Sequence, residues 1–290
     1  MSASAEPKAW DARETRAFVA VPGEHDDKYS RGVLTLATGS LEYPGAAVLS
    51  VEAACRTGVG MARYVGPPEP TRLVVARRPE VVVRPGATNA VVAGSGVVRE
   101  TIDPSQLLVI TEAIASRTPL VCDAGLLEAE FLERVRDAGT ACVITPHAAE
   151  LARVLSSLGE SVSPLDVSRD PEGSSALIAD RFGVVVLLKG SHTHIVGPDL
   201  GHGARFRAQV STTNHWMATA GTGDVLAGIL GALIATQHSR VREDLAALGG
   251  VAASAAWLHA RAGELASAGG PLVALEVAQS VSRVVTEVLA

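Results

Sequence analysis

The segment of this sequence best suited to chemistry is Gly221-Thr222-Gly223-Asp224, at the start of an Ala- and Leu-rich run that continues to residue 236. Glycines directly before a helix let backbone N–H groups and the positive end of the helix dipole converge on an anion, and phosphate is the natural ligand. A carboxylate would repel that phosphate unless it had another function. We expect Asp224 to take a proton from a hydroxyl that attacks the phosphoryl group. An ordinary capped helix start is the alternative interpretation.

A second candidate segment, Lys189-Gly190-Ser191-His192-Thr193, follows a predicted strand at residues 184–188. The chain has three lysines against 22 arginines, so a lysine at a strand end is less readily explained as general surface charge. A compact ammonium suits a point contact with a phosphate. Gly190 lets a ligand approach the backbone, and the hydroxyls of Ser191 and Thr193 can hydrogen-bond it. A solvated charge at a strand end is the other interpretation.

Three further groups of residues follow predicted strands. They are His147 in Thr145-Pro146-His147, Asp123 after residues 120–122, and the loop Gly94-Ser95-Gly96. Open α/β sheets bind ligands at the carboxyl ends of their strands, so these groups are expected beside the first two segments. His147 could equally be a helix cap or a surface residue. Asp123 could cap the following helix, orient a metal-bound water, or both. Mg²⁺ would be held mainly by nucleotide phosphates and water, with Asp123 and Glu150 as candidate protein ligands.

The elements that must position these residues are Val-rich runs alternating with Ala- and Leu-rich runs. The Val-rich runs lack polar alternation, which indicates strands buried on both faces of a mostly parallel sheet covered by helices. Strands are predicted at residues 33–37, 73–76, 90–93, 120–122, 141–144 and 184–188, with an antiparallel edge hairpin from residues 192–196 and 205–210. Helices are predicted at residues 46–57, 103–116, 127–137, 148–155, 174–181, 222–236, 244–266 and 275–289.

Composition restricts the class of protein. A chain of 290 residues, 47% of them hydrophobic, can form one α/β domain, which we place at residues 28–290 after an arm or short helix at residues 1–27. The net charge of −6 argues against nucleic acid or an anionic membrane as partner. No long apolar stretch or secretory start is visible, so a cytoplasmic protein is expected. The three cysteines have no paired spacing and suggest neither a disulfide nor a zinc site.

The order of the motifs resembles that of one family. The matching segments are Lys28-Tyr29-Ser30-Arg31-Gly32, Tyr43-Pro44-Gly45-Ala46-Ala47, Asp123-Ala124, Thr145-Pro146-His147 with Glu150, Lys189-Gly190-Ser191-His192-Thr193 and Gly221-Thr222-Gly223-Asp224. In this order they resemble the ADP/ATP-dependent NAD(P)H-hydrate dehydratases. The resemblance implies a ribokinase-like three-layer α/β/α sandwich with a mostly parallel central sheet. It also implies ADP- or ATP-dependent dehydration of the S-form of hydrated NADH or NADPH.

The resemblance also assigns residues. The nucleotide would contact Lys189, Gly190, Ser191, His192, Thr193, Thr222 and Gly223. The hydrated nicotinamide would face Ala46, Ala47, Gly94, Gly96, His147 and Asp224, with Asp224 as the catalytic base. Two positions depart from the family pattern: Ala148-Ala149 stands where Pro-Gly is usual, and Ser191 where a small apolar residue is usual. Both departures put the shape of the local loops in question.

The resemblance further implies a homo-oligomer and a separate NAD(P)H-hydrate epimerase acting on the same metabolite. Two other functions stay open. One is a kinase for a small hydroxylated metabolite, such as a vitamin precursor, which would share the fold and the Gly-Thr-Gly-Asp segment. The other is a non-catalytic nucleotide sensor that keeps the pocket without turnover.

Overall fold

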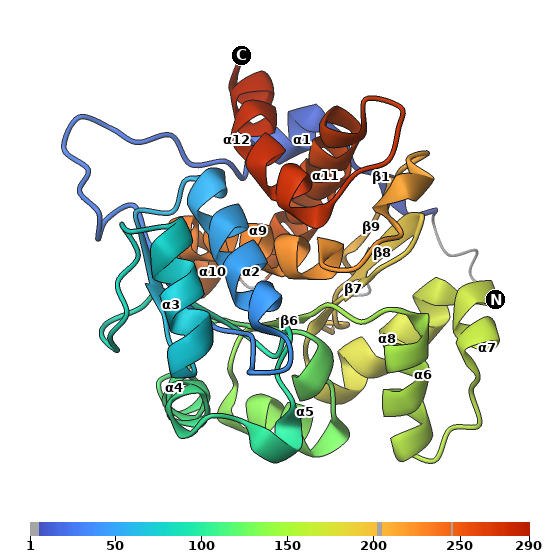
Figure 1. Cartoon of the computed structure of the whole chain (residues 1–290). Helices are drawn as coiled ribbons and strands as arrows, with labels where there is room; N and C mark the ends of the chain where they lie inside the picture. Colours follow the sequence, from blue (N-terminus) through green and yellow to red (C-terminus); the bar gives the residue numbers. More distant parts are fainter. Residues whose placement is uncertain (1–5, 202–204, 245) are drawn as a thin grey trace.

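Within residues 6–201, 205–244 and 246–290, which the computed structural model describes, the chain forms a nine-stranded β-sheet between two layers of helices (Figure 1). From one edge to the other, the strands are β1 (Lys8–Ala9), β9 (Arg207–Ser211), β8 (His192–Val196), β7 (Val185–Leu188), β6 (Cys142–Ile144), β5 (Leu120–Cys122), β4 (Ala90–Ala93), β2 (Val33–Ala37) and β3 (Met61–Tyr64). Among these strands, β8 alone runs opposite to the rest. The other strands run in one direction, so their carboxyl ends lie along the same side of the sheet, which we call its carboxyl edge.

The sheet is apolar on both faces, as the sequence predicts. Leu34 and Leu36 of β2 and Val92 of β4 belong to the hydrophobic core on one face of the sheet. Ala37 of β2 and Val91 of β4 belong to the core on the opposite face. Helices cover both cores, so these side chains can be apolar on every position. The mostly parallel three-layer architecture predicted from the sequence is confirmed.

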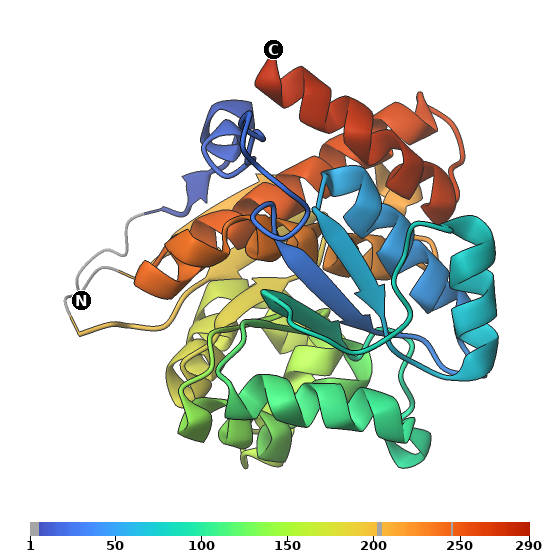
Figure 2. The same ribbon diagram turned by 90° about the vertical axis from the view of Figure 1, so that its left-hand side faces the viewer.

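The two helix layers lie on opposite sides of the sheet (Figure 2). The first core is closed by α2 (Pro44–Thr57), α9 (Thr222–Thr236), α11 (Ala247–Ser267) and α12 (Ala274–Leu289), with α1 (Ala12–Arg16), α3 (Pro68–Arg77) and α10 (His238–Glu243) around them. The second core is closed by α4 (Pro104–Ala115), α5 (Ala129–Ala138), α6 (Ala148–Ser157) and α8 (Pro171–Phe182), with α7 (Pro164–Arg169) beside them. None of the described helices has the length and apolar character needed to span a bilayer.

Helix α9 is held closely on two sides through glycines. A Cβ on Gly228 would lie 2.2 Å from the carbonyl oxygen of Ser50 in α2, and one on Gly231 would lie 2.1 Å from a methyl group of Val92 in β4. Only glycine permits backbone contacts of this kind. The start of α9 is thereby fixed relative to the strand ends.

The sequence assigns one element wrongly and misses two strands. The predicted strand at residues 73–76 is wrong, because these residues lie in α3, where Leu73 and Val75 are exposed. The Pro-rich segment at residues 67–70 begins that helix, since proline fits the first turn of a helix. The edge strand β3 was not predicted, and neither was β1, which pairs with β9 and so covers the edge of the predicted hairpin.

Candidate active site

The centre of the candidate site is the carboxylate of Asp123, directly after β5. Its Oδ2 accepts a hydrogen bond from Ser95 Oγ at 2.9 Å, and its Oδ1 accepts one from Thr145 Oγ1 at 2.8 Å. Lys189 Nζ donates to the same Oδ1 at 2.8 Å. Four strand ends, those of β4, β5, β6 and β7, thus converge on one buried carboxylate. Asp123 makes no capping hydrogen bond to the short 3-10 helix after it, so the predicted capping role is wrong.

Lys189 is fixed at both its backbone and its side chain. Its N–H donates to the carbonyl oxygen of Pro146 at 2.8 Å, which ties the end of β7 to the segment before α6. Its ammonium also lies 3.8 Å from Glu150 Oε2. Burial opposes the charge on Lys189, but the nearby carboxylates of Asp123, Glu150 and Asp224 outweigh it and hold the lysine pKa above its ordinary value. The ammonium is therefore a permanent positive charge of the site.

The start of α9 lies against this lysine. Gly221 has a φ of +92°, and a Cβ there would meet Leu49 and Ala274 within 3 Å. At Gly223 an added Cβ would lie 3.5 Å from Lys189 Nζ. The first turn of α9 therefore presents its free N–H groups next to a fixed cation, an arrangement suited to phosphate.

Asp224 is the acid in that first turn, and it does not cap the helix, whose N-cap residue is Gly221. Burial raises the pKa of Asp224 to about 7, the charge of Asp123 adds to this effect, and Lys189 opposes it. A carboxyl group with a pKa near 7 can both hold and release a proton at neutral pH, as a general base requires.

The residues predicted to face the hydrated nicotinamide also lie near this edge. Gly94 has a φ of +102°, and a Cβ there would lie 2.0 Å from the Asp123 carbonyl oxygen. Gly96 packs on α2, since its Cβ would lie 2.4 Å from that of Ala46. The Cβ of Ala47 is similarly close to Gly39. The loop after β4, the first turn of α2 and the backbone of Asp123 are therefore packed against one another, and Ala46 and Ala47 are buried in this packing.

His147 is the N-cap of α6 and also part of the site rim. Its ring Nδ1 accepts hydrogen bonds from the backbone N–H groups of Ala149 and Glu150, at 3.2 and 3.3 Å. Its backbone N–H donates to Glu150 Oε2 at 2.8 Å. With Nδ1 accepting, the ring proton belongs on Nε2, which lies 3.6 Å from Glu150 Oε2. The Ala148-Ala149 departure is accommodated by a regular capped helix start.

A cavity of about 320 Å³ adjoins Lys189 and the start of α9. Of the seven residues predicted to contact the nucleotide, six line it: Lys189, Gly190, Ser191, Thr193, Thr222 and Gly223. His192 does not, because strand alternation turns its side chain to the other face of the hairpin, where Nδ1 lies 2.9 Å from Ser211 Oγ. The cavity continues between β9 and α11, where Val210, Leu226 and Ala256 make it apolar.

The described residues form no cluster of three or more groups able to hold a metal ion. Both oxygens of Asp123 already accept hydrogen bonds from Ser95, Thr145 and Lys189, and Glu150 Oε2 accepts from His147. These side chains therefore do not make a protein cage for Mg²⁺.

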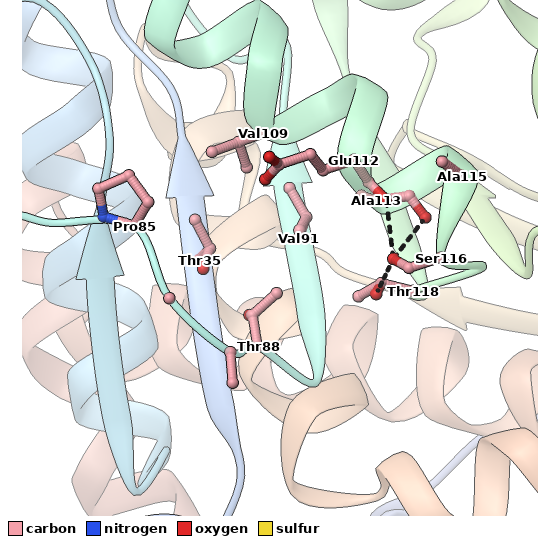
Figure 3. Close-up of a pocket in the computed structure, with 12 residues that line it drawn as sticks. Thr35, Pro85, Thr88, Val91, Val109, Glu112, Ala113, Ala115, Ser116 and Thr118 are labelled. Atoms are coloured by element: carbon pink, nitrogen blue, oxygen red, sulfur yellow. Dashed lines mark hydrogen bonds between the residues drawn. The ribbon is translucent and has the colours of Figure 1, made fainter.

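Sequence reasoning missed several cavity residues, among them Asn214, Met217 and His259. Asn214 and Met217 follow the hairpin in a segment without periodicity, and His259 lies in an Ala-rich helix where nothing marks it as functional. A larger hollow of about 590 Å³ lies at the opposite edge of the sheet, between residues 85–88 and α4 (Figure 3). Its Ser116 and Thr118 hydroxyls share a hydrogen bond of 2.9 Å, and among the described residues that line it Glu112 alone is charged. Its lining includes none of the candidate site residues at the carboxyl ends of the strands, such as Asp123, Lys189 and Asp224.

Comparison with known proteins supports the family that the motifs of the sequence resemble. A family model described as NAD(P)H-hydrate dehydratase matches residues 34–282. The bifunctional NAD(P)H-hydrate repair enzyme Nnr of Mycobacterium leprae is 36% identical over 286 residues, covering 96% of this chain and 54% of that protein. The Nnr of Corynebacterium glutamicum is 35% identical over 231 residues, covering 76% of this chain and 38% of that protein. The chain spans about half the length of these relatives.

A third relative, the ADP-dependent (S)-NAD(P)H-hydrate dehydratase of Neisseria meningitidis, is 32% identical over 257 residues, covering 83% of this chain and 79% of that protein.

Solved structures share the fold. The ADP/ATP-dependent NAD(P)H-hydrate dehydratase from Bacillus subtilis, co-crystallized with ATP/Mg²⁺, has a TM-score of 0.78 at 23% identity and covers 97% of this chain and 99% of that one. A ribokinase-like superfamily protein from Enterococcus faecalis has a TM-score of 0.74 at 18% identity, covering 97% of this chain and 96% of that one. At such identities the likeness supports the fold alone. The match over residues 34–282 goes further: this chain belongs to the NAD(P)H-hydrate dehydratase family.

Proposed function

We propose that this chain dehydrates the S-form of hydrated NADH or NADPH, using ADP or ATP as the phosphoryl donor. The observation that carries the proposal is Asp224, a carboxyl group with a pKa of about 7 in the first turn of α9, beside the fixed ammonium of Lys189. Family membership selects hydrated nicotinamide as the acceptor. The alternative acceptor, a stable metabolite hydroxyl, is favoured by no feature of the site.

The proposed sequence has two steps. Asp224 accepts the proton of the ring hydroxyl, and the hydroxyl oxygen attacks the terminal phosphoryl group while its bond to the remaining nucleotide breaks. The N–H groups at the start of α9 and the Lys189 ammonium offset the negative charge of that group. The phosphorylated ring then loses phosphate from one carbon and a proton from the neighbouring carbon, which restores the dihydronicotinamide double bond.

The roles of the other residues follow from their positions. Lys189, Gly190, Ser191, Thr193, Thr222 and Gly223 would hold the nucleotide, and Ala46, Ala47, Gly94, Gly96 and His147 would face the hydrated ring. Mg²⁺ would travel with the nucleotide phosphates, since Asp123 is fully engaged by protein donors. The Nnr relatives are named bifunctional, and we propose that an epimerase activity supplies the S-form to this chain. A homo-oligomer and a cytoplasmic location stay predictions.

The test is to incubate the protein with purified S-form hydrated NADH and either ADP or ATP, following the near-ultraviolet absorbance of NADH and the nucleotide products. We expect one phosphate and one shortened nucleotide for each NADH restored. A stable phosphorylated compound without restored NADH would instead establish a kinase. Nucleotide binding without release of phosphate would support a sensor.

The base assignment has its own variant. Asp224→Asn should lower turnover by about 100- to 10,000-fold while nucleotide still binds. The matched control is Asp137→Asn, an exposed acid at the end of α5, which should leave turnover unchanged. Near-normal turnover of Asp224→Asn would show that another group takes the proton.

A further inference from the structure

Helix α11 gives one polar side chain to the nucleotide cavity. Its cavity face carries Ala256 and Ala260, and one turn later Gly263 contacts Met217, whose Sδ would lie 2.1 Å from a Cβ at that position. These small residues leave room beside the helix. Among the described residues of α11, His259 alone combines a place on this wall with a hydrogen-bonding group.

The other polar side chains around the cavity are largely engaged. Thr222 Oγ1 donates to backbone carbonyl oxygens of Met217 and Thr219, both at 3.1 Å. Asn214 Nδ2 donates to the carbonyl oxygen of Gly263 at 2.9 Å, and its Oδ1 accepts from the N–H of Trp216. The Nε2 atom of His259, in contrast, is enclosed and has no hydrogen-bond partner among the described residues. Because His259 lines the cavity while its Nε2 is enclosed, we take Nδ1 as the ring nitrogen that a ligand can reach.

His259 is neutral at physiological pH. Burial lowers the pKa of its imidazole to about 4, and the charge of Lys189 acts in the same direction, against an opposing effect of the Thr222 backbone. A neutral ring has one N–H group and one acceptor nitrogen. We assign the N–H to the enclosed Nε2, which leaves Nδ1 as the acceptor nitrogen for the cavity.

An acceptor at this place distinguishes the parts of a nucleotide. Phosphate oxygens carry no proton to donate at neutral pH, and they are attracted to Lys189 and the start of α9. The flat base suits the apolar end of the cavity at Val210, Leu226 and Ala256. Between these two ends a nucleotide has its ribose, whose hydroxyls can donate. We propose that His259 accepts a hydrogen bond from a ribose hydroxyl and thereby selects ribonucleotides over deoxyribonucleotides.

This inference rests on the proposed use of ADP or ATP, and it can be tested without turnover. Calorimetry would compare ADP, 2′-deoxy-ADP and 3′-deoxy-ADP on the wild type and on His259→Leu. We expect the wild type to bind one deoxy nucleotide about 10-fold more weakly than ADP. His259→Leu should bind ADP about 10-fold more weakly than the wild type, and the loss of that hydroxyl should then have no further effect.

Other outcomes would overturn the proposal. If His259→Leu weakens ADP and both deoxy nucleotides equally, the ring has only a structural role. If the effect of the variant disappears with inosine diphosphate, which lacks the adenine amino group, but persists with both deoxy nucleotides, His259 reads the base. His259→Gln keeps a donor and an acceptor, so it should retain part of the preference for ADP, and it serves as the second variant should His259→Leu fail to fold.

The two proposals fail separately. Ribose discrimination that depends on His259, together with no restored NADH, would reject the proposed dehydration alone. Restored NADH with equal binding of ADP and both deoxy nucleotides would reject only the role of His259.

Discussion

Replacing Asp224 by Asn should stabilise the protein without ligand, although the same change removes the proposed base. Burial raises the Asp224 pKa from its ordinary 3.8 to about 7, so the folded state disfavours the charged carboxylate. At 1.36 kcal/mol for each tenfold change in proton affinity, the full difference is about 4 kcal/mol. Asp224 is partly exposed, and we halve this value for solvent screening, to about 2 kcal/mol.

The effect has a defined pH dependence. Below pH 3.8 the carboxyl group is protonated in both states and costs no stability. As pH rises toward 7 the unfolded chain releases this proton while the folded chain keeps it, so stability falls until the folded group also ionises. Asn carries no charge at any pH. The advantage of Asp224→Asn should therefore be small at pH 5, about a third of its full size, and complete above pH 7.

Thermal unfolding at pH 5 and pH 8 checks this expectation. At pH 8 we expect the variant to melt about 4 °C above the wild type, and at pH 5 only about 1 °C above it. The control Asp137→Asn should change Tm little at either pH, because that side chain is exposed. Equal gains at the two pH values, or a loss at pH 8, would show that the folded site does not disfavour the Asp224 charge.

Three further changes test the surrounding contacts. Lys189→Met should weaken ADP binding about 100-fold by calorimetry and lower stability by about 3 kcal/mol, because Asp123 loses its cation; unchanged binding would remove Lys189 from the phosphate site. Gly94→Ala should cost more stability in denaturant titration than Gly139→Ala, since both have positive φ but only the first places a Cβ against backbone; equal losses would contradict the contact. Thr145→Val should cost about 1 kcal/mol in the same titration and lower kcat/KM, and a neutral result would show that Thr145 does not hold Asp123.

The fold could be predicted where composition settled the type of element. Residues 90–93 and 120–122 are apolar at every position, and both are strands buried on two faces. Residues 73–76 have a similar composition but lie in a surface helix. The prediction failed there because a short apolar run does not distinguish a strand from a helix. In β3, Arg63 interrupts the apolar pattern and hides a strand whose partner is distant in sequence.

The candidate site could be predicted only in part. The sequence indicates that several loops follow strands, and topology then brings Asp123, His147 and Lys189 to one edge. The contacts of Asp123 depend on strand register and rotamers, which spacing does not encode. His192 and His259 show two ways in which motifs fail to identify the residues of the cavity. The first belongs to a family motif but faces away from the cavity, while the second has no motif and lies on its wall.

The close seating of α9 through Gly228 and Gly231 has an entropic consequence. A loop that must be ordered around phosphate loses conformational freedom on binding, and this loss subtracts from affinity. Here the amides at the head of α9 are already immobilised by packing two and three turns away. Association with a nucleotide can therefore leave the backbone of this helix unchanged, and most of the intrinsic attraction between amides and phosphate is retained as affinity.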